Sequence, residues 1–145
     1  NSNIIKGKPG VWVDNKKIEI YPELNTKQYL TNVPIHPKLN FIYATFTDIS
    51  EKLILKLKND STAVLLIDTN NKHGMAEERR LFMKLITENC HLPVIIGRYY
   101  ENLTSESLRL YSATDMGALL LDGLGDGIFI ATTQEGFLKN DFHMF

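Results

Sequence analysis

One stretch decides the fold: an apolar run at Ala63–Asp68 (AVLLID), a polar loop at Thr69–Gly74 (TNNKHG) and a periodic segment at Met75–Glu88 (MAEERRLFMKLITE). The first run has strand length and no polar alternation. The last segment has apolar residues at helical spacing, which predicts an amphipathic helix. Its apolar stripe consists of Leu81, Leu85 and Ile86. A fully apolar strand followed by a helix is typical of a parallel sheet that is covered on both faces.

The same strand and helix pattern recurs on either side of this stretch. In each case an apolar run of strand length precedes a segment with helical periodicity. The further predicted elements are a strand at Phe41–Thr45, a helix at Asp48–Leu57, a strand at Val94–Gly97, a helix at Leu103–Ala113 capped by Thr104 or Ser105, and a strand at Ala118–Asp122. In the helix at 48–57, the stripe is Ile49, Leu53 and Leu57, with Ile54 beside it.

The domain organisation follows from where this pattern starts and stops. Residues 1–39 form an irregular lead-in, in which Val11–Val13 and Ile18–Ile20 flank Asp14–Lys17 as a β-hairpin. Residues 40–133 hold four βα units, and 134–145 form a tail. We therefore predict one α/β domain, 1–145, of parallel βα repeats: a partial or degenerate TIM-barrel-like fold with an N-terminal β-hairpin. The sheet could stay open, curl, or be completed by the ends, and a doubly wound open sheet is the competing arrangement.

Composition excludes several classes of protein. The chain has 145 residues, 16 Lys plus Arg against 17 Asp plus Glu, and 43% hydrophobic residues, which is typical of one globular domain. A net charge of -1 argues against a dedicated nucleic-acid surface, and no apolar run is long enough to span a membrane. The single cysteine, Cys90, excludes an intrachain disulfide and a self-contained iron–sulfur site. We expect a reducing, cytoplasmic location. Because the chain has no initiator Met, we also expect a processed chain or a piece of a longer protein.

Five residues could form a ligand rim. In parallel α/β sheets, ligands bind beyond the carboxyl ends of the strands, so residues that follow each predicted strand are candidates. Carboxylates, an imidazole and a guanidinium on one rim would suit a phosphorylated or metal-bound ligand. The structural alternative is ordinary loop polarity and helix capping. The candidates are Asp68, His73, Arg98, Asp122 and Asp126.

Three glycines, Gly123, Gly125 and Gly127, follow the last predicted strand. Their backbone amides could cradle a phosphate, but the spacing is not the dinucleotide-binding fingerprint. Tight turns that need a positive φ are an equal explanation.

Two other features of the sequence are better explained by a structural role than by a functional one. Cys90 precedes His91, but adjacent side chains seldom face each other, so a small buried thiol is expected rather than a nucleophile. The charge run Glu77–Arg80 is predicted to be a solvated helix face with i,i+3 pairs.

A family resemblance rests on Gly117–Ile128 (GALLLDGLGDGI) and on the upstream segment Leu92–Ile96 (LPVII). Both resemble the larger, three-domain form of 4-hydroxy-3-methylbut-2-enyl diphosphate synthase, over about Leu92 to Ile130. The chain looks like the middle domain that this form inserts between its other two domains. The cluster-domain stretch Cys-Pro-x-Cys-Gly-Arg has no counterpart after Ile130, so no catalytic or cluster residue is carried over. Gly123, Gly125 and Gly127 are carried over as a fold signature only.

The resemblance implies the following about the parent enzyme. It reductively opens 2-C-methyl-D-erythritol 2,4-cyclodiphosphate to the allylic diphosphate in the non-mevalonate route to isoprenoids. A (β/α)8 barrel binds the substrate, and a second domain carries a 4Fe-4S cluster held by three cysteines and a glutamate. Ferredoxin or flavodoxin serves as reductant. The insert is implied to be a structural spacer that lets the cluster domain reach the barrel of its own chain or of a partner in a homodimer.

The preferred hypothesis is therefore a spacer domain that has no cofactor and no chemistry of its own. An autonomous module that binds a phosphorylated small metabolite at the strand C-terminal rim is the alternative. A third hypothesis is subunit association, for which a large apolar patch on a helix or at an open barrel edge is expected.

Overall fold

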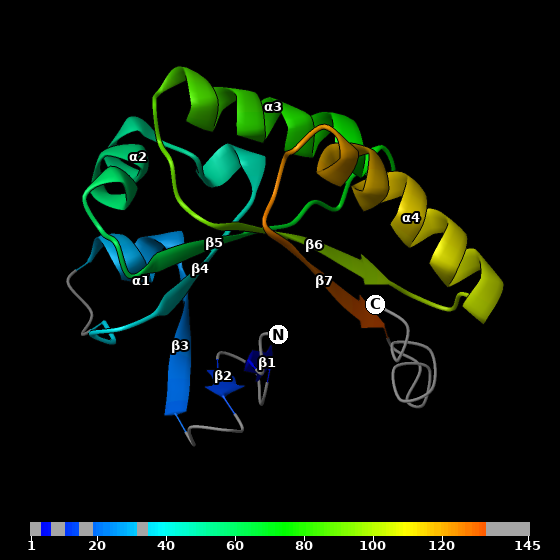
Figure 1. The fold of residues 1–145 in the computed structure, drawn as a ribbon, viewed down its shortest axis with the longest axis horizontal. Coiled ribbons are helices and arrows are strands. Elements are labelled where there is room, and N and C mark those ends of the chain that lie inside the picture. The colour runs from blue at the N-terminus through cyan, green and yellow to red at the C-terminus, as the bar shows by residue number, and fades with distance from the viewer. Residues whose placement is uncertain (1–3, 7–10, 15–18, 32–34, 133–145) are drawn as a thin grey trace.

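The computed structural model describes residues 4–6, 11–14, 19–31 and 35–132 (Figure 1). The predicted hairpin turn at 15–17 and the tail at 134–145 lie outside these residues. In chain order the elements are β1 (Ile4–Lys6), β2 (Val11–Asp14), β3 (Glu19–Asn25), α1 (Thr26–Leu30), β4 (Asn40–Ala44), the short 3-10 helix η1 (Phe46–Asp48), α2 (Glu51–Lys58), β5 (Ala63–Ile67), α3 (Gly74–Thr87), β6 (Val94–Tyr100), α4 (Ser105–Leu121) and β7 (Gly127–Thr132). Within the described part of the chain, no helix is both long and apolar enough to cross a membrane.

The strands form one sheet in sequence order, β1-β2-β3-β4-β5-β6-β7. The β1–β2 and β2–β3 pairs are antiparallel, whereas β3 to β7 run parallel. Figure 1 shows the sheet curled into a half-barrel, with α1 to α4 on its convex side and the N-terminal hairpin curving back beneath it. The strand order never reverses, so the doubly wound alternative is excluded. The predicted α/β fold of parallel βα repeats is confirmed.

Two apolar clusters lie on opposite faces of the sheet, because successive strand residues point to opposite sides. The larger cluster, under the helices, includes Ile42, Leu65 and Ile96. A smaller one on the concave side includes Phe41 and Leu66, which alternate with the first set. In the described residues the helices cover only the convex face, so the expected covering of both faces does not come from helices on both sides. The strands are nonetheless apolar throughout, because a curled sheet encloses its own concave side.

The repeat starts earlier than residue 40. Strand β3 pairs in parallel with β4 through Glu23 and Phe41, and α1 connects the two strands. Helix α1 begins with a capping box, in which the Asn25 side chain accepts from the Gln28 amide. The first βα unit therefore lies in the predicted irregular lead-in. We attribute the omission to its size, because a five-residue helix is too short to show periodicity.

The predicted strand at Ala118–Asp122 was wrong, because this segment is the last part of helix α4. The helix ends in a Schellman motif: the Leu124 amide donates to Leu119 O over 2.8 Å, and the Gly123 amide donates to Leu120 O over 3.0 Å. The true last strand is β7, which begins after the glycines. A short apolar run does not by itself distinguish a buried helix end from a strand.

The other helix predictions are close to the observed elements. Thr104 caps α4 by accepting from the Ser107 amide. The helix predicted from Asp48 is divided into η1 and α2, and Ser50 caps α2. In α3, Ile86 is 49% exposed, and Phe82 takes its place in the buried stripe.

Candidate functional site

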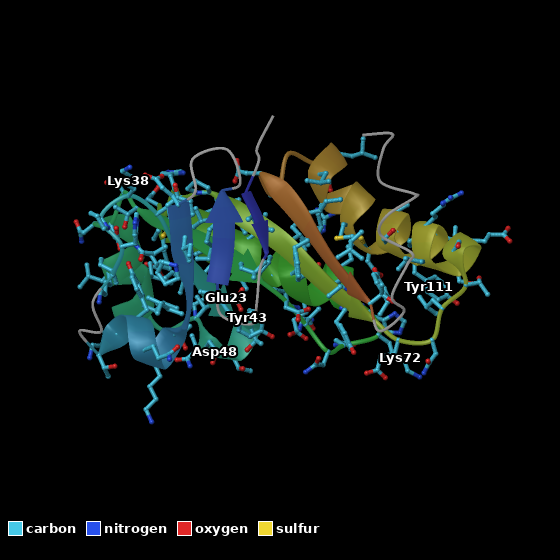
Figure 2. All side chains as sticks on the ribbon, turned by 90° about the horizontal axis from the view of Figure 1, so that it is seen from below. Glu23, Lys38, Tyr43, Asp48, Lys72 and Tyr111 are labelled. Carbon is cyan, nitrogen blue, oxygen red and sulfur yellow. The ribbon has the colours of Figure 1, made fainter. Side chains whose placement is uncertain are left out.

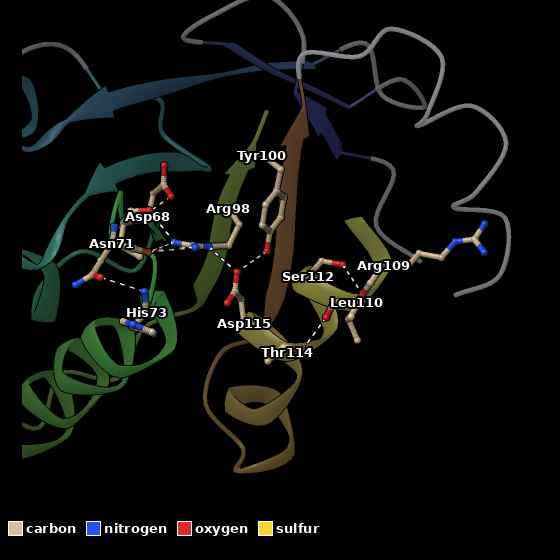
Figure 3. A network of polar contacts seen from close by, with 11 residues as sticks. Asp68, Asn71, His73, Arg98, Tyr100, Arg109, Leu110, Ser112, Thr114 and Asp115 are labelled. Atoms are coloured by element: carbon tan, nitrogen blue, oxygen red, sulfur yellow. Dashed lines mark hydrogen bonds and ion pairs between the residues drawn. The ribbon is translucent and has the colours of Figure 1, made fainter. Parts of the chain in front are cut away.

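The carboxyl edge of the sheet is built around Arg98, a buried residue of β6 (Figure 3). Its Nη1 donates to Thr69 O over 2.8 Å and to Asn71 O over 3.3 Å, and Nη2 also donates to Asn71 O. Nε donates to the Asp115 carboxylate of α4 over 3.2 Å. One guanidinium thus fastens the β5–α3 loop and helix α4 to β6.

Asp115 and Tyr100 complete this arrangement. The Tyr100 hydroxyl donates to Asp115 Oδ2 over 2.8 Å, so one carboxylate accepts from both a phenol and the guanidinium. Burial, and then the bond to Asp115, raise the pKa of Tyr100, so the phenol stays protonated. Burial opposes the charge on Arg98, but Tyr100 and Asp115 outweigh it, and the pKa of Arg98 is raised. The guanidinium is therefore a permanent structural cation, and each of its three nitrogens donates a hydrogen bond.

Helix α3 approaches Arg98 closely at its first residue, Gly74. A Cβ built on Gly74 would lie 2.7 Å from Arg98 Cζ and 2.9 Å from Thr69 Cγ2. Only glycine leaves room here for the guanidinium beside the start of the helix.

Glu78 lies one turn further along α3 and is only 2% exposed. Neither carboxyl oxygen has a hydrogen-bond partner among the described residues. Burial raises the pKa of Glu78 to about 8; Arg98 acts to lower it, whereas Asp68, Asp115 and Glu77 raise it. The expectation of a solvated charge run was therefore wrong at this position. Glu78 belongs to the apolar stripe because it lies three and four residues before Leu81 and Phe82.

A cavity of about 320 Å³ opens near the carboxyl edge of the sheet. It is lined by Tyr43, Leu66, Asp68, Gly97, Arg98, Tyr99, Phe129 and Ala131. Figure 2 views the concave side and shows Tyr43, Glu23 and Asp48 close together. The Tyr43 hydroxyl donates to Asp68 Oδ2 over 3.3 Å, and burial, followed by the Asp68 charge, raises the pKa of Tyr43 to about 12. Aromatic rings and a carboxylate characterise this cavity, and the guanidinium of Arg98 is engaged elsewhere.

The structure places three of the five predicted rim residues at the carboxyl edge. Asp68 follows β5, where its Oδ1 accepts from the Thr69 amide over 2.7 Å. His73 is exposed at the start of α3, and its backbone amide donates to Asn71 Oδ1 over 3.0 Å. Asn71 thus links His73 to Arg98 through the loop.

Asp122 and Asp126 lie at the opposite, amino edge, because they precede β7 instead of following a strand. Asp122 accepts from Arg79 over 2.5 Å at the surface. The Asp126 carboxylate accepts from the Val94 amide over 2.9 Å, and the Asp126 amide donates to Val94 O over 2.7 Å. Asp126 therefore fastens the start of β7 to the start of β6, so the expectation that all five residues share one rim was wrong in its geometry.

The glycine-rich segment also lies at the amino edge, and it is a backbone turn. Gly123 has φ +73° and Gly125 has φ +91°. A Cβ on Gly125 would lie 2.8 Å from Ile96 Cδ1. The interpretation as turns that require a positive φ is confirmed for these two positions.

Sequence reasoning missed Glu78, Tyr100 and Asp115. For Glu78 the signal was present, because its spacing puts it on the apolar stripe of α3. Asp115 had a weaker signal, as the single charge in the run from Leu110 to Leu121. Nothing in the sequence pairs Asp115 with Arg98, since the contact joins different elements.

The residues present do not fit an iron–sulfur cluster. The single cysteine, Cys90, is buried, and burial raises its thiol pKa, which disfavours the thiolate that binds iron. In the part of the chain that the structure describes, no three His, Cys, Asp or Glu side chains gather as metal ligands.

Comparison with known proteins finds relatives that share one name. No protein-family model and no solved structure matches the chain. It is 38% identical over 92 residues to a 4-hydroxy-3-methylbut-2-en-1-yl diphosphate synthase (flavodoxin) of Parabacteroides distasonis, covering 63% of this chain and 15% of that protein. The equivalent protein of Phocaeicola vulgatus is 31% identical over 111 residues, 77% of this chain and 18% of its own length. That of Bacteroides fragilis is 28% identical over 130 residues, 90% and 19% respectively. The chain thus spans less than a fifth of these relatives.

Proposed function

This chain belongs to the 4-hydroxy-3-methylbut-2-en-1-yl diphosphate synthase family as a segment of such an enzyme, and from this we propose that it is a structural spacer domain. The parent enzyme converts 2-C-methyl-D-erythritol 2,4-cyclodiphosphate reductively to 4-hydroxy-3-methylbut-2-enyl diphosphate. Its reaction would be carried out by other domains, a substrate barrel and a 4Fe-4S domain, in a reducing cytoplasm. Flavodoxin or ferredoxin would supply electrons. Flavodoxin is part of the relatives' names.

The observation that carries this proposal is the coverage of the match. A similarity that extends over 90% of this chain and 19% of the relative is what one domain of a multidomain enzyme gives. The engagement of the polar groups supports it further: Arg98, Asp115 and Asp126 bind other parts of the domain, as groups that stabilise a fold do. The poor fit of the residues to a cluster is consistent with chemistry elsewhere.

The test uses the full-length enzyme. We expect Asp68→Asn and His73→Ala each to leave kcat and KM for the cyclodiphosphate within about twofold, because neither group would touch substrate. Removing the whole domain should lower turnover with flavodoxin at least tenfold, while the iron content and the substrate Kd are retained. A tenfold loss of kcat in either single variant would contradict the spacer role.

The alternative function, a module that binds a phosphorylated metabolite, has one favourable observation. Asp68, His73 and Arg98 do lie at one edge of the sheet, and two of them, Asp68 and Arg98, line a cavity of about 320 Å³. Calorimetric titration with sugar and prenyl diphosphates tests it. Micromolar binding that is lost in His73→Ala but kept in Lys72→Ala would favour the module, and absence of heat would favour the spacer.

A further inference from the structure

The β5–α3 loop, residues 69–73, is fastened to β6 by one side chain. Arg98 Nη1 donates to Thr69 O over 2.8 Å and to Asn71 O over 3.3 Å, and Nη2 donates to Asn71 O over 3.3 Å (Figure 3). The other hydrogen bonds of the loop residues reach no further than the strand end before the loop and the first turn of α3 after it. The attachment to β6 therefore depends on two neutral carbonyl acceptors, and the bonds to one of them are long.

Glu78 lies close to this guanidinium but has no bond to it. Side chains on a helix lean toward its N-terminus, so Glu78 extends over Gly74, four residues earlier. A Cβ on Gly74 would lie 2.7 Å from Arg98 Cζ, which places the guanidinium beside the same turn of the helix. Glu78 is 2% exposed, and neither of its carboxyl oxygens has a hydrogen-bond partner among the described residues. An acid and a guanidinium are thus buried together without being joined.

The surroundings of Glu78 favour its neutral form in this arrangement. Burial raises the pKa of the carboxyl group most. Among the charged groups that act on it, Arg98 on β6 favours the carboxylate, whereas Asp68 after β5, Asp115 on α4 and Glu77 on α3 itself oppose it. While Glu78 is neutral, it does not compete with the loop carbonyls for the guanidinium.

Loss of the proton to solvent reverses this balance. A buried carboxylate without a donor is costly, and the guanidinium is the cation beside it. A hydrogen bond from a guanidinium to a carboxylate is roughly twice as strong as one to a neutral carbonyl. The two Nη groups of Arg98 can therefore exchange the loop carbonyls for the Glu78 carboxylate, while Nε still donates to Asp115 over 3.2 Å.

We propose that Glu78 is a proton-controlled switch for the β5–α3 loop: Arg98 binds the loop when Glu78 is protonated, and binds Glu78 and releases the loop when Glu78 is ionised. The loop carries Asn71 and His73 at the carboxyl edge of the sheet, so its release changes the shape of that edge. The switch does not rest on the spacer role, because all of its contacts lie within this domain.

The experiment is amide hydrogen exchange of the full-length protein, followed by mass spectrometry in the peptide that contains residues 69–73. Parent and Glu78→Gln are compared at the same pH, because the chemical exchange rate itself depends on pH. We expect their rates to agree within about twofold at about pH 5.5, and the parent to exchange at least about tenfold faster at about pH 8.5. Glu88→Gln changes an exposed carboxylate at the other end of α3 and should behave like the parent at both pH values.

Gly74→Ala supplies the released loop for reference. Its Cβ would take the place of the guanidinium, so residues 69–73 should exchange at least about tenfold faster than in the parent at about pH 5.5. Exchange as slow as in the parent would show that Arg98 does not hold the loop, which would overturn the proposal.

Equal rates in the parent and in Glu78→Gln at about pH 8.5 would also overturn it. The same holds if the peptide of β6, Val94–Tyr100, is accelerated as much as the loop, because the whole fold would then loosen. Acceleration confined to residues 69–73 is the result that supports the switch.

Discussion

The two edges of the parallel sheet are held together by different means. At the carboxyl edge, charged side chains make the connections: Arg98 reaches the β5–α3 loop and α4 at once. At the amino edge, backbone geometry makes them: Gly123 and Gly125 turn the chain at positive φ, and Asp126 pairs with the backbone of Val94. A buried charge network is costly to disturb, because removing one member leaves the others unpaired. A backbone turn is disturbed only by a change that alters its φ or its close contacts.

The carboxyl edge itself combines a satisfied and an unsatisfied group. Arg98 uses all three of its nitrogens, whereas the nearby Glu78 has no partner for either carboxyl oxygen among the described residues. Arg98 keeps its charge because its pKa is raised, whereas Glu78 makes the stability of the fold depend on pH.

The largest effect is expected for Arg98→Ala. The change leaves the Asp115 carboxylate without its cation, and the Thr69 and Asn71 carbonyls without a donor. We expect a loss of about 3–5 kcal/mol in the free energy of unfolding, measured by urea denaturation. Arg80→Ala, at an exposed position of α3, is the control and should cost less than about 0.5 kcal/mol. A loss below about 1 kcal/mol for Arg98→Ala would remove the distinction between the edges.

The next effect concerns pH and Glu78. Its folded pKa of about 8 exceeds the ordinary 4.5, so between these values the folded state holds a proton that the unfolded state has released. Stability attributable to Glu78 is therefore fully present below pH 4.5, is lost as pH rises toward 8, and is constant above. Glu78→Gln should raise the unfolding free energy at pH 8.5 by roughly 2–4 kcal/mol more than at pH 4.5.

Thermal and urea denaturation at both pH values test this, with Glu77→Gln as the neighbouring control. An equal effect of Glu78→Gln at the two pH values would show that its carboxyl group titrates normally in the fold.

Two glycine substitutions sharpen the account of the amino edge. Gly125→Ala places a Cβ at φ +91° and 2.8 Å from Ile96 Cδ1, so we expect a loss of about 1–3 kcal/mol. Gly117→Ala lies inside α4 with open space around it, so we expect a gain of about 0.5–1 kcal/mol. Urea denaturation measures the change in unfolding free energy for each variant. Changes of opposite sign support a backbone requirement at residue 125, and changes of the same sign would refute it.

The smallest effect is expected for the surface ion pair of Arg79 and Asp122 at the amino edge. Both side chains are substantially exposed, so a double-mutant cycle with Arg79→Ala and Asp122→Ala should give a coupling of about 0–1 kcal/mol that falls in high salt. A coupling above about 2 kcal/mol would mean that charge also holds this edge.

Much of the fold could be predicted because its signals are local. The signals for the strand at Ala63–Ile67 and for helix α3 are complete within a few residues, and both elements appear in the structure where expected. The end of α4 could not be assigned in this way, since five apolar residues fit a strand and a buried helix turn equally. Because of that single ambiguity, Asp122 and Asp126 were predicted at the carboxyl edge of the sheet, whereas they lie at the amino edge.

The sequence by itself determined the class of fold, parallel βα repeats, because hydrophobic periodicity and turn residues act over short distances. Only the tertiary structure decided that the sheet curls in sequence order, that Arg98 binds Asp115, and that Glu78 is buried. These features depend on contacts between residues far apart in the chain. Their partners are chosen by packing, which no local pattern records.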